Sequence, residues 1–159
     1  METQLSFEME QVNSTLEHIR NVQRLLNLCM NELGERAVAH DATKFSPSEW
    51  PCFLEHTQKL SGLTYGSQEY KDALKAMAPA LENHYKQNPH HPEYHLGGIQ
   101  DMTLLDLLEM LCDWMAATRR HKDGDIRKSI EHNRQRFNYG FELEKIFNNT
   151  VNFFERKVK

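Results

Sequence analysis

The chain is poor in the residues that interrupt helices and has no segment that could cross a membrane. It contains 7 glycines and 5 prolines in 159 residues, fewer than average usage gives, which favours helices joined by short connections. No apolar run approaches the roughly 20 residues that span a bilayer, and residues 1–4 lack the basic and apolar regions of a signal peptide. The sequence therefore predicts a cytoplasmic protein that does not bind a membrane.

Cysteine is also scarce. The three cysteines, Cys29, Cys52 and Cys112, stand singly in apolar stretches and form no Cys-x-x-Cys pair. An odd number without metal-ligand spacing is typical of reduced thiols that serve as small core residues. This pattern also argues against a structural zinc site built from thiolates.

Positive charge is not in excess. The 19 lysines and arginines oppose 23 acidic residues, so the formal net charge is −4 at pH 7. This balance argues against nucleic acid as a partner held by bulk charge. With 39% hydrophobic and 26% charged residues, the composition is that of a globular protein. The length suits a single domain that buries a core without disulfides.

The apolar residues recur at helical spacing from one end of the chain to the other. Ser14-Thr15-Leu16-Glu17 has the pattern of a capping box, which predicts a helix over about 13–32 that Gly34 ends. A short helix over about 35–42 should follow. Ser46-Pro47-Ser48-Glu49 is a second start signal, for a helix over about 47–60.

Four more helices are expected in the rest of the chain, over about 67–87 with an interruption at Pro79, 102–121 begun by Asp101 or Thr103, 125–137 and 141–157. No segment alternates with period two over a useful length. The sequence therefore predicts an all-α fold, with about six to seven helices in one domain over 1–159.

Histidine is abundant, with nine in all and four between positions 84 and 95. Together with nearby acids they form a set of candidate metal ligands: His18, His40, Asp41, His84, His90, His91, Glu93, His95 and Asp113. Imidazole and carboxylate together suit Mn²⁺, Fe²⁺, Zn²⁺ or Co²⁺. The irregular loop over 88–100 is long for a mere connection, and loops of this length are often functional.

The predicted helix over 102–121 places a carboxylate among apolar neighbours. Asp113 is flanked by Leu111, Cys112, Trp114 and Met115, so it should be at least partly buried. A buried carboxylate needs a cation, a strong hydrogen-bond donor or a proton. The residues leave two readings open, a metal site or an ion pair with Arg119 or Arg120.

The order of His18, His40-Asp41 and Asp113 on separate predicted helices resembles the HD-domain superfamily of metal-dependent phosphohydrolases. Segments 15–22, 39–45 and 111–117 are similar to its three ligand-bearing stretches, and Lys44 follows the Asp by three residues as in the HDxGK form. Segment 88–93 is similar to the paired histidines and glutamate of the binuclear branch. The chain is also similar to an uncharacterised family of small bacterial and phage proteins with HDxTKF, NPHHPEY and EMLCDW motifs.

The resemblance implies a ligand set for one or two divalent ions, which could be Mn, Fe, Co, Zn or Mg. The first ion would bind His18, His40, Asp41 and Asp113. A second would bind His84 and either His90 or His91, with Asp41 as the bridge. Glu93 would orient a histidine or a water, and the candidates for phosphate contact are Lys44, Arg119, Arg120 and His121.

The function that the resemblance implies is hydrolysis of a nucleotide or another small phosphate ester by metal-activated water. An HD-like di-iron oxygenase is an alternative enzyme class. A third hypothesis is a non-catalytic helical binding protein in which the histidines are structural. Phe147, Phe153 and Phe154 suggest a homodimer formed through the C-terminal helices.

Overall fold

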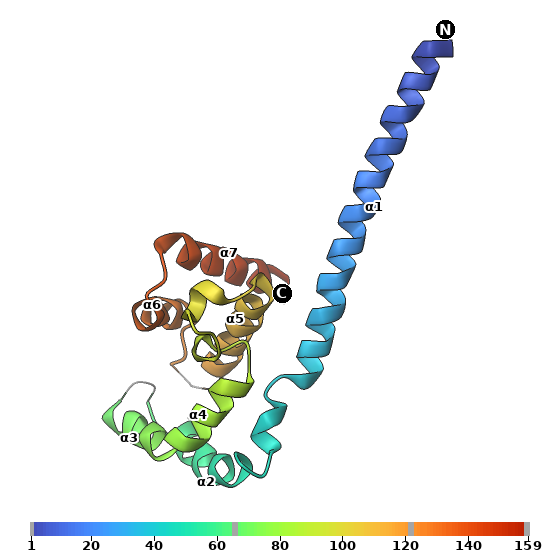
Figure 1. The fold of residues 1–159 in the computed structure, drawn as a ribbon. Coiled ribbons are helices and arrows are strands. Elements are labelled where there is room, and N and C mark those ends of the chain that lie inside the picture. Colours follow the sequence, from blue (N-terminus) through green and yellow to red (C-terminus); the bar gives the residue numbers. More distant parts are fainter. Residues whose placement is uncertain (1, 65–66, 121–122, 158–159) are drawn as a thin grey trace. The chain divides into compact units, whose positions relative to one another are not determined.

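The protein is described by a computed structural model that covers residues 2–64, 67–120 and 123–157. In these residues the chain is helical, with no strand (Figure 1). The α-helices are α1 (Glu2–Ala39), α2 (Trp50–Ser61), α3 (Gln68–Ala76), α4 (Ala78–Gln87), α5 (Leu104–Thr118), α6 (Ile126–Phe137) and α7 (Phe141–Lys157), and the short 3₁₀ helices are η1 (Ala42–Phe45), η2 (Pro92–Tyr94) and η3 (Gly98–Asp101). The predicted all-α fold class is confirmed.

The chain divides between Ala39 and His40 into two compact units. The first unit is α1, which carries His18. The second unit contains the remaining helices and every other candidate ligand, from His40 to Asp113.

Helix α1 is longer than predicted, because it begins at Glu2 and runs through Gly34 to Ala39. The Thr15 hydroxyl donates to the Gln11 carbonyl (2.9 Å) inside the helix, so the expected capping box at 14–17 is not a helix start. A single glycine in a helix costs only about 1 kcal/mol relative to alanine. The ion pair between Glu32 and Arg36 (2.7 Å) spans Gly34 and supports the helix at that point.

The other helix starts follow local sequence signals with one exception. Ser67 caps α3, and Thr103 forms a capping box with Asp106 at the start of α5. The predicted interruption near Pro79 is confirmed, since α3 and α4 are separated at Met77. Proline lacks the N–H that would continue the helix, so it begins α4 instead.

The exception is α2, which begins at Trp50 rather than at 47. Glu49 makes no side-chain cap for this helix. Its carboxylate is fully buried and contacts Asn83 and His84 instead. A tertiary contact has therefore replaced the local one that the sequence pattern predicts.

The core of the second unit lies among α5, α6, α7 and the loop before α5. It contains Ile99, Met110, Leu111, Ile130, Tyr139, Phe147 and Val151. Helix α6 packs on both α5 and α7. The Phe147 ring meets Trp114 and Tyr139 edge to face, with centroids 5.8 Å and 5.6 Å away, an arrangement that adds to burial of apolar surface.

All three cysteines are free, as predicted. The expected core role is wrong for Cys29 and Cys112, which are exposed. Within the described ranges, no helix is both long enough and apolar enough to span a bilayer.

Phe147→Ala should lower the free energy of unfolding by about 3–5 kcal/mol, because it opens a cavity in the core. Phe141→Ala on the same helix should cost less than about 1 kcal/mol, because Phe141 is 64% exposed. Urea unfolding followed by circular dichroism measures both. Equal losses for the two variants would contradict the placement of the core.

Candidate metal centre

Asp41 lies directly after α1, in a left-handed backbone conformation (φ 58°, ψ 11°). This conformation is uncommon for residues other than glycine, and Asp and Asn adopt it more readily than most. Such a conformation is retained where the surrounding structure holds the side chain in place. The residue begins η1, and its Oδ2 pairs with the Lys44 ammonium on the next turn. The other oxygen, Oδ1, faces the histidines of α4 and the following loop.

His84 of α4 is held by a carboxylate behind it. Glu49 and His84 are buried, at 0% and 1% exposure, and Glu49 Oε2 lies 3.0 Å from His84 Nδ1. Because a carboxylate oxygen accepts, the Nδ1–H of His84 donates to Glu49, and Nε2 is the nitrogen directed at Asp41. That Nε2 lies 3.0 Å from Asp41 Oδ1. The Asn83 amide donates to the other oxygen of Glu49 (2.8 Å) and keeps it in place.

The loop that carries the next two histidines starts where proline ends α4. Pro89 disfavours helical backbone at the residue before it, and Asn88 is accordingly extended after Gln87. The buried Asn88 amide donates to the Thr43 hydroxyl (2.9 Å) and the His84 carbonyl (2.7 Å). These two hydrogen bonds tie the beginning of the loop to η1 and α4.

A turn then brings His90 and His91 toward Asp41. The turn is closed by a hydrogen bond from the His91 N–H to the Asn88 carbonyl (3.0 Å). His95 contributes through its Nε2, which lies 2.8 Å from the Pro89 carbonyl. His95 is therefore a structural residue of the loop.

Glu109 of α5 orients two histidines. Its Oε1 lies 3.2 Å from His90 Nδ1 and 2.9 Å from His40 Nδ1, so both rings present Nε2 on the opposite side. His90 Nε2 lies 3.5 Å from Asp41 Oδ1, and His40 Nε2 lies 3.6 Å from Asp41 Oδ2. Asp113, one turn after Glu109 on the same helix face, lies 3.7 Å from His40 Nε2.

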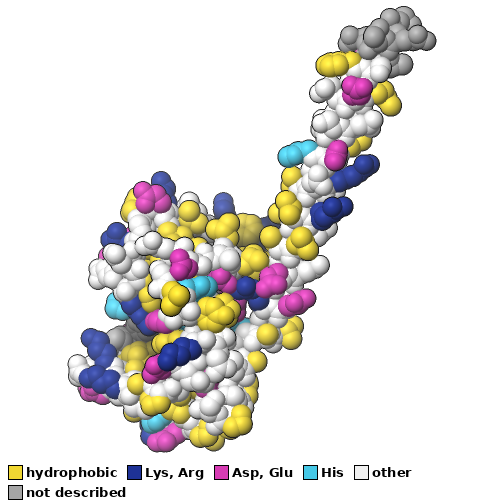
Figure 2. All heavy atoms as spheres, in the orientation of Figure 1, with side chains coloured by type: hydrophobic (Ala, Val, Ile, Leu, Met, Phe, Trp, Pro, Cys, Tyr) yellow, Lys and Arg dark blue, Asp and Glu magenta, His cyan; other side chains and the backbone are white. Residues whose placement is uncertain are grey.

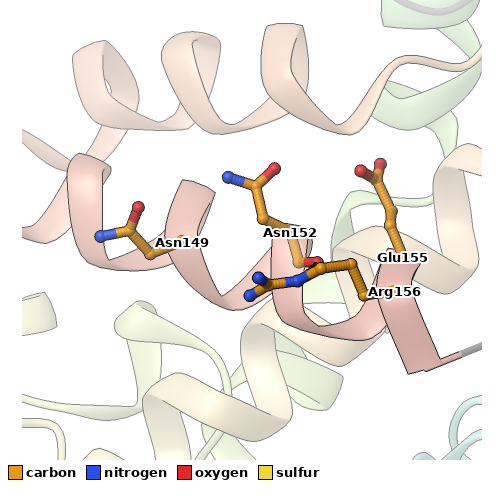
Figure 3. A pocket seen from close by; sticks show the side chains of 4 residues that line it. All are labelled: Asn149, Asn152, Glu155 and Arg156. Atoms are coloured by element: carbon orange, nitrogen blue, oxygen red, sulfur yellow. Dashed lines mark hydrogen bonds between the residues drawn. The ribbon is translucent and has the colours of Figure 1, made fainter.

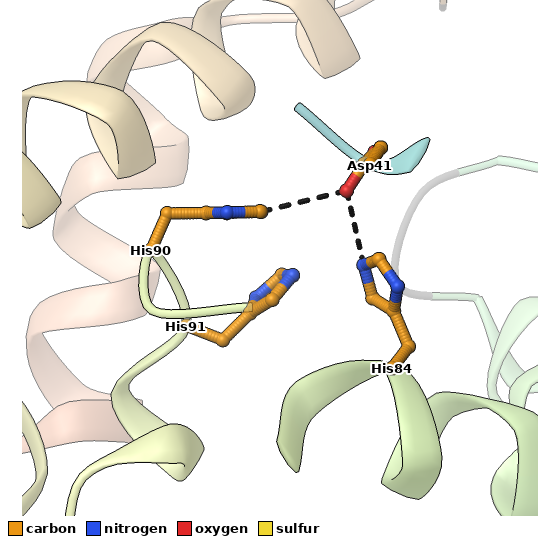
Figure 4. Close-up of side chains that lie close together, drawn as sticks. All are labelled: Asp41, His84, His90 and His91. Carbon is orange, nitrogen blue, oxygen red and sulfur yellow. Dashed lines mark ion pairs between the residues drawn. The ribbon is translucent and has the colours of Figure 1, made fainter. Parts of the chain in front are cut away.

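Buried ligand atoms from four residues converge on one point (Figure 4). Asp41 Oδ1 and the Nε2 atoms of His84, His90 and His91 are buried, and among the described residues none has a hydrogen-bond partner. One ligand atom from each residue lies within 4.8 Å of the others. Unpaired buried polar atoms cost about 1–3 kcal/mol each, and opposite ligands of an ion with ~2.1 Å bonds are about 4.2 Å apart. A small adjustment would therefore close these atoms around a metal ion.

The protonation of this group suits metal binding. Burial, together with the neighbouring His90 and His84, lowers the pKa of His91 to about 3, so its ring is neutral at pH 7. Burial raises the pKa of Asp41, but contacts with His84 and His90 and the Lys44 ammonium outweigh it and keep that pKa below its ordinary value. Neutral imidazole and ionised carboxylate are the forms that ligate metals.

A second group shares Asp41. His40, Asp41 and Asp113 offer ligand atoms within 4.8 Å of one another. The ion pair with Asp113, opposed by burial and supported by Glu109 and Asp41, raises the pKa of His40 to about 9. His40 is therefore protonated at pH 7 without a metal, and an ion at this position must exchange with that proton. The two groups differ in how readily they accept a cation.

The structure brings together six of the seven predicted metal ligands: His40, Asp41, His84, His90, His91 and Asp113. Both His90 and His91 point into the cluster, whereas the sequence left a choice between them. His18 belongs to the α1 unit, and its role as a ligand stays a prediction. Asp113 contacts His40, which favours the metal-site reading over the pairing with arginine.

The residues that were predicted to orient ligands or to contact phosphate do not all lie near the candidate ligands. Lys44 lies against Asp41. Glu93 pairs with Arg136 (2.7 Å) on the exposed side of the loop, and the carboxylates that contact the histidines are Glu49 and Glu109. Arg119 and Arg120 are exposed at the end of α5. His121 lies outside the described residues.

Sequence reasoning missed Glu49 and gave no role to Glu109. Glu49 matches a helix start signal, so the sequence gives no separate indication that it contacts His84. Glu109 stands four residues before Asp113, so the two carboxylates share one helix face. That spacing is the signal that could have identified Glu109.

A pocket elsewhere in the second unit is lined by side chains of α7 (Figure 3). They are Asn149, Asn152, Glu155 and Arg156. The Arg127 guanidinium of α6 donates to Glu155 (3.0 Å) and Asn152 (2.7 Å), so two of these side chains are engaged in helix packing. The pocket contains none of the candidate ligands.

Fold and site define an all-helical protein with histidine–carboxylate groups that could hold a metal ion. The chain belongs to DUF5662, a family of unknown function, which matches it over residues 8–159. The matched region includes the whole ligand cluster. No curated protein and no solved structure matches the chain.

Glu49→Gln should weaken binding of Zn²⁺ roughly 10–100-fold, because an amide is a weaker acceptor for the Nδ1 proton of His84 and makes its Nε2 less basic. Competition with a chromogenic chelator measures the affinity. Glu82→Gln is the matched control, since Glu82 is on the outer face of α4 and pairs with Lys86. Equal affinities in the two variants would contradict an orienting role for Glu49.

Proposed function

We propose that this protein is a metal-dependent phosphohydrolase that acts on a nucleotide or another small phosphate ester. The observation that carries the proposal is the convergence of Asp41 Oδ1 with the Nε2 atoms of three histidines, none of which makes a hydrogen bond to another described residue. The order of ligands along the chain, which resembles that of HD-domain phosphohydrolases, supplies the reaction class. The first argument supports a bound cation, and the second, which uses some of the same residues, supports the type of reaction.

The shared carboxylate supports a site for two divalent ions. Asp41 offers Oδ1 to His84 and His90 and Oδ2 to His40, as a bridging ligand would. The first position, with neutral His91, is ready for an ion, and the second must lose the His40 proton. Ligands of this kind suit Mn, Fe, Co or Zn more than Mg. We expect one tightly bound and one weaker ion.

The charge of the cluster makes substrate binding depend on the metal. The carboxylates of Asp41, Glu49, Glu109 and Asp113 face one lysine, Lys44. The carboxylates count −4, and Lys44 with the protonated His40 counts +2, so the formal charge is −2 with the other imidazoles counted as neutral, which repels a phosphate ester. One divalent ion brings this charge to 0, and a second ion that displaces the His40 proton brings it to +1. Phosphate esters should therefore bind most tightly when both positions are loaded.

Bound divalent ions supply a more acidic water and neutralise charge on the phosphoryl group. The protein's own side chains would orient the ligand atoms and the phosphate group. Glu49 and Glu109 hold the histidine rings, so the ligand atoms do not need to reorganise. Lys44, beside Asp41 on the face opposite His84, is placed to neutralise a non-bridging phosphate oxygen.

Elemental analysis of the purified full-length protein should find two divalent ions per chain after loading with Mn²⁺, Co²⁺ or Zn²⁺. Asp41→Asn should hold less than one ion, because Asp41 serves both positions. His91→Ala should lose one ion and keep the other. His56→Gln on α2 is the control, because His56 lies outside every candidate ligand group. Full metal content in Asp41→Asn would overturn the bridging role.

Release of inorganic phosphate from a panel of nucleotides and simple esters tests the activity. Lys44→Ala should raise KM roughly 10–100-fold, because it removes a charged contact worth about 1.5–3 kcal/mol. Lys59→Ala on the surface of α2 should change neither KM nor kcat, since the exposed Lys59 pairs with the surface residue Glu55 and belongs to a different element from Lys44.

Two outcomes would count against hydrolysis. Metal-loaded protein that leaves the whole panel intact would contradict the proposal. Oxygen uptake by the iron-loaded protein, without phosphate release, would favour the di-iron oxygenase.

A further inference from the structure

Helix α1 exposes apolar side chains along its length, visible as yellow patches in Figure 2. Its exposed large hydrophobic residues are Phe7, Met9, Val12, Leu16, Ile19, Val22, Leu25, Leu26, Leu28, Met30 and Val38. Most of the stability of a helix comes from packing its apolar face. An exposed apolar surface of this extent marks an interaction site.

The apolar residues of α1 follow a heptad repeat over residues 9–36, four heptads in length. With Met9 at position a, the a positions are Met9, Leu16, Gln23 and Met30, and the d positions are Val12, Ile19, Leu26 and Leu33. Seven of these eight residues are apolar. A straight α-helix drifts about 20° per heptad from a strict 3.5-residue repeat. A stripe that keeps this repeat over four heptads therefore fits a helix that supercoils with another helix.

We propose that α1 forms a parallel, in-register coiled coil with α1 of a second copy of this chain. The eight a and d residues are here called the seam. Gln23, the one polar residue of the seam, indicates the partner and its direction. In a parallel dimer each a residue faces the same residue of the other helix, so the two Gln23 amides can hydrogen-bond to each other. An antiparallel partner would set Gln23 against an apolar d residue and leave its amide unpaired.

The residues beside the seam permit this pairing. In a parallel dimer each g residue lies near the e residue of the next heptad of its partner. The pairs are Glu8 with Asn13, Thr15 with Arg20, Val22 with Asn27, and Cys29 with Gly34. None of these pairs brings like charges together, so nothing at the flanks opposes self-association. The contact is self-complementary, as a two-fold dimer requires.

Five of the exposed hydrophobic residues of α1 lie outside the seam, and two of these provide controls. Phe7 and Leu28 occupy f positions, on the outer side of the coiled coil, and Leu28 is 59% exposed. A substitution at Leu28 changes the apolar surface of α1 as much as one at the seam, but it leaves the seam intact.

The test is the solution mass of the full chain, measured by light scattering during gel filtration. The wild type should have twice the mass of the 18.7 kDa chain. The double variant Ile19→Lys with Leu26→Lys should be a monomer, because it places charges in the seam. Leu28→Lys should remain a dimer. A monomeric wild type, or a dimer that the seam variant leaves unchanged, would overturn the proposal.

A cross-linking variant tests the same proposal in case the two lysines unfold α1. Ile19→Cys, in a chain where Cys29→Ser removes the native thiol of α1, should form a covalent dimer on mild oxidation. Leu28→Cys in the same background should not, because the two f positions point away from each other. Covalent dimers from Leu28→Cys but not from Ile19→Cys would contradict a parallel seam. Metal content of each variant shows separately whether the ligand cluster is intact.

Discussion

The candidate ligand cluster depends on the carboxylates that hold its histidine rings in place. Glu49 accepts from Nδ1 of His84, and Glu109 accepts from Nδ1 of His40 and His90. With these protons turned outward, the Nε2 atoms are directed at Asp41. Buried acceptors that face one another are unfavourable without a cation or a proton between them. The two carboxylates behind the histidines therefore help to arrange a group of side chains that could hold a metal ion, and Glu109 belongs to one of the candidate ligand groups itself.

The secondary structure around the cluster serves this arrangement. Asp41 adopts a left-handed conformation at the start of η1, and Pro89 ends α4 so that His90 and His91 can turn back toward His84. Helix α5 supplies Glu109 and Asp113 from one face. Because α5 also carries Met110 and Leu111 into the core, the ligands stand on a rigid element, which limits movement of the site.

The two units of the chain differ in how their apolar residues are arranged. The unit from His40 onward holds a buried polar cluster and an apolar core, although some of its large hydrophobic residues, such as Leu96 and Leu104, are exposed. The α1 unit has a seam of apolar residues and a single polar position, Gln23. A helix of this composition is stable when its seam is covered. Coupling self-association through α1 to a metal site in the other unit would give a dimer with two such sites.

The sequence by itself determined the helical class, most helix starts and six of the residues that form the candidate ligand cluster. Proline, Ser/Thr/Asp caps and apolar spacing act within a few residues, so Ser67, Pro79, Thr103 and Asp125 mark the observed starts. The His-rich loop was identified from its length and composition. The prediction that Gly34 ends the first helix was wrong, because the cost of one glycine is small within a long helix.

Only the tertiary structure decided which residues hold the histidines in place. Glu49 lies 35 positions from His84, and Glu109 lies 69 positions from His40. No local pattern connects residues that far apart, since their contact depends on how α2, α4 and α5 pack. Glu49 fits a helix start signal equally well, and only its burial against His84 shows that it serves the ligand cluster.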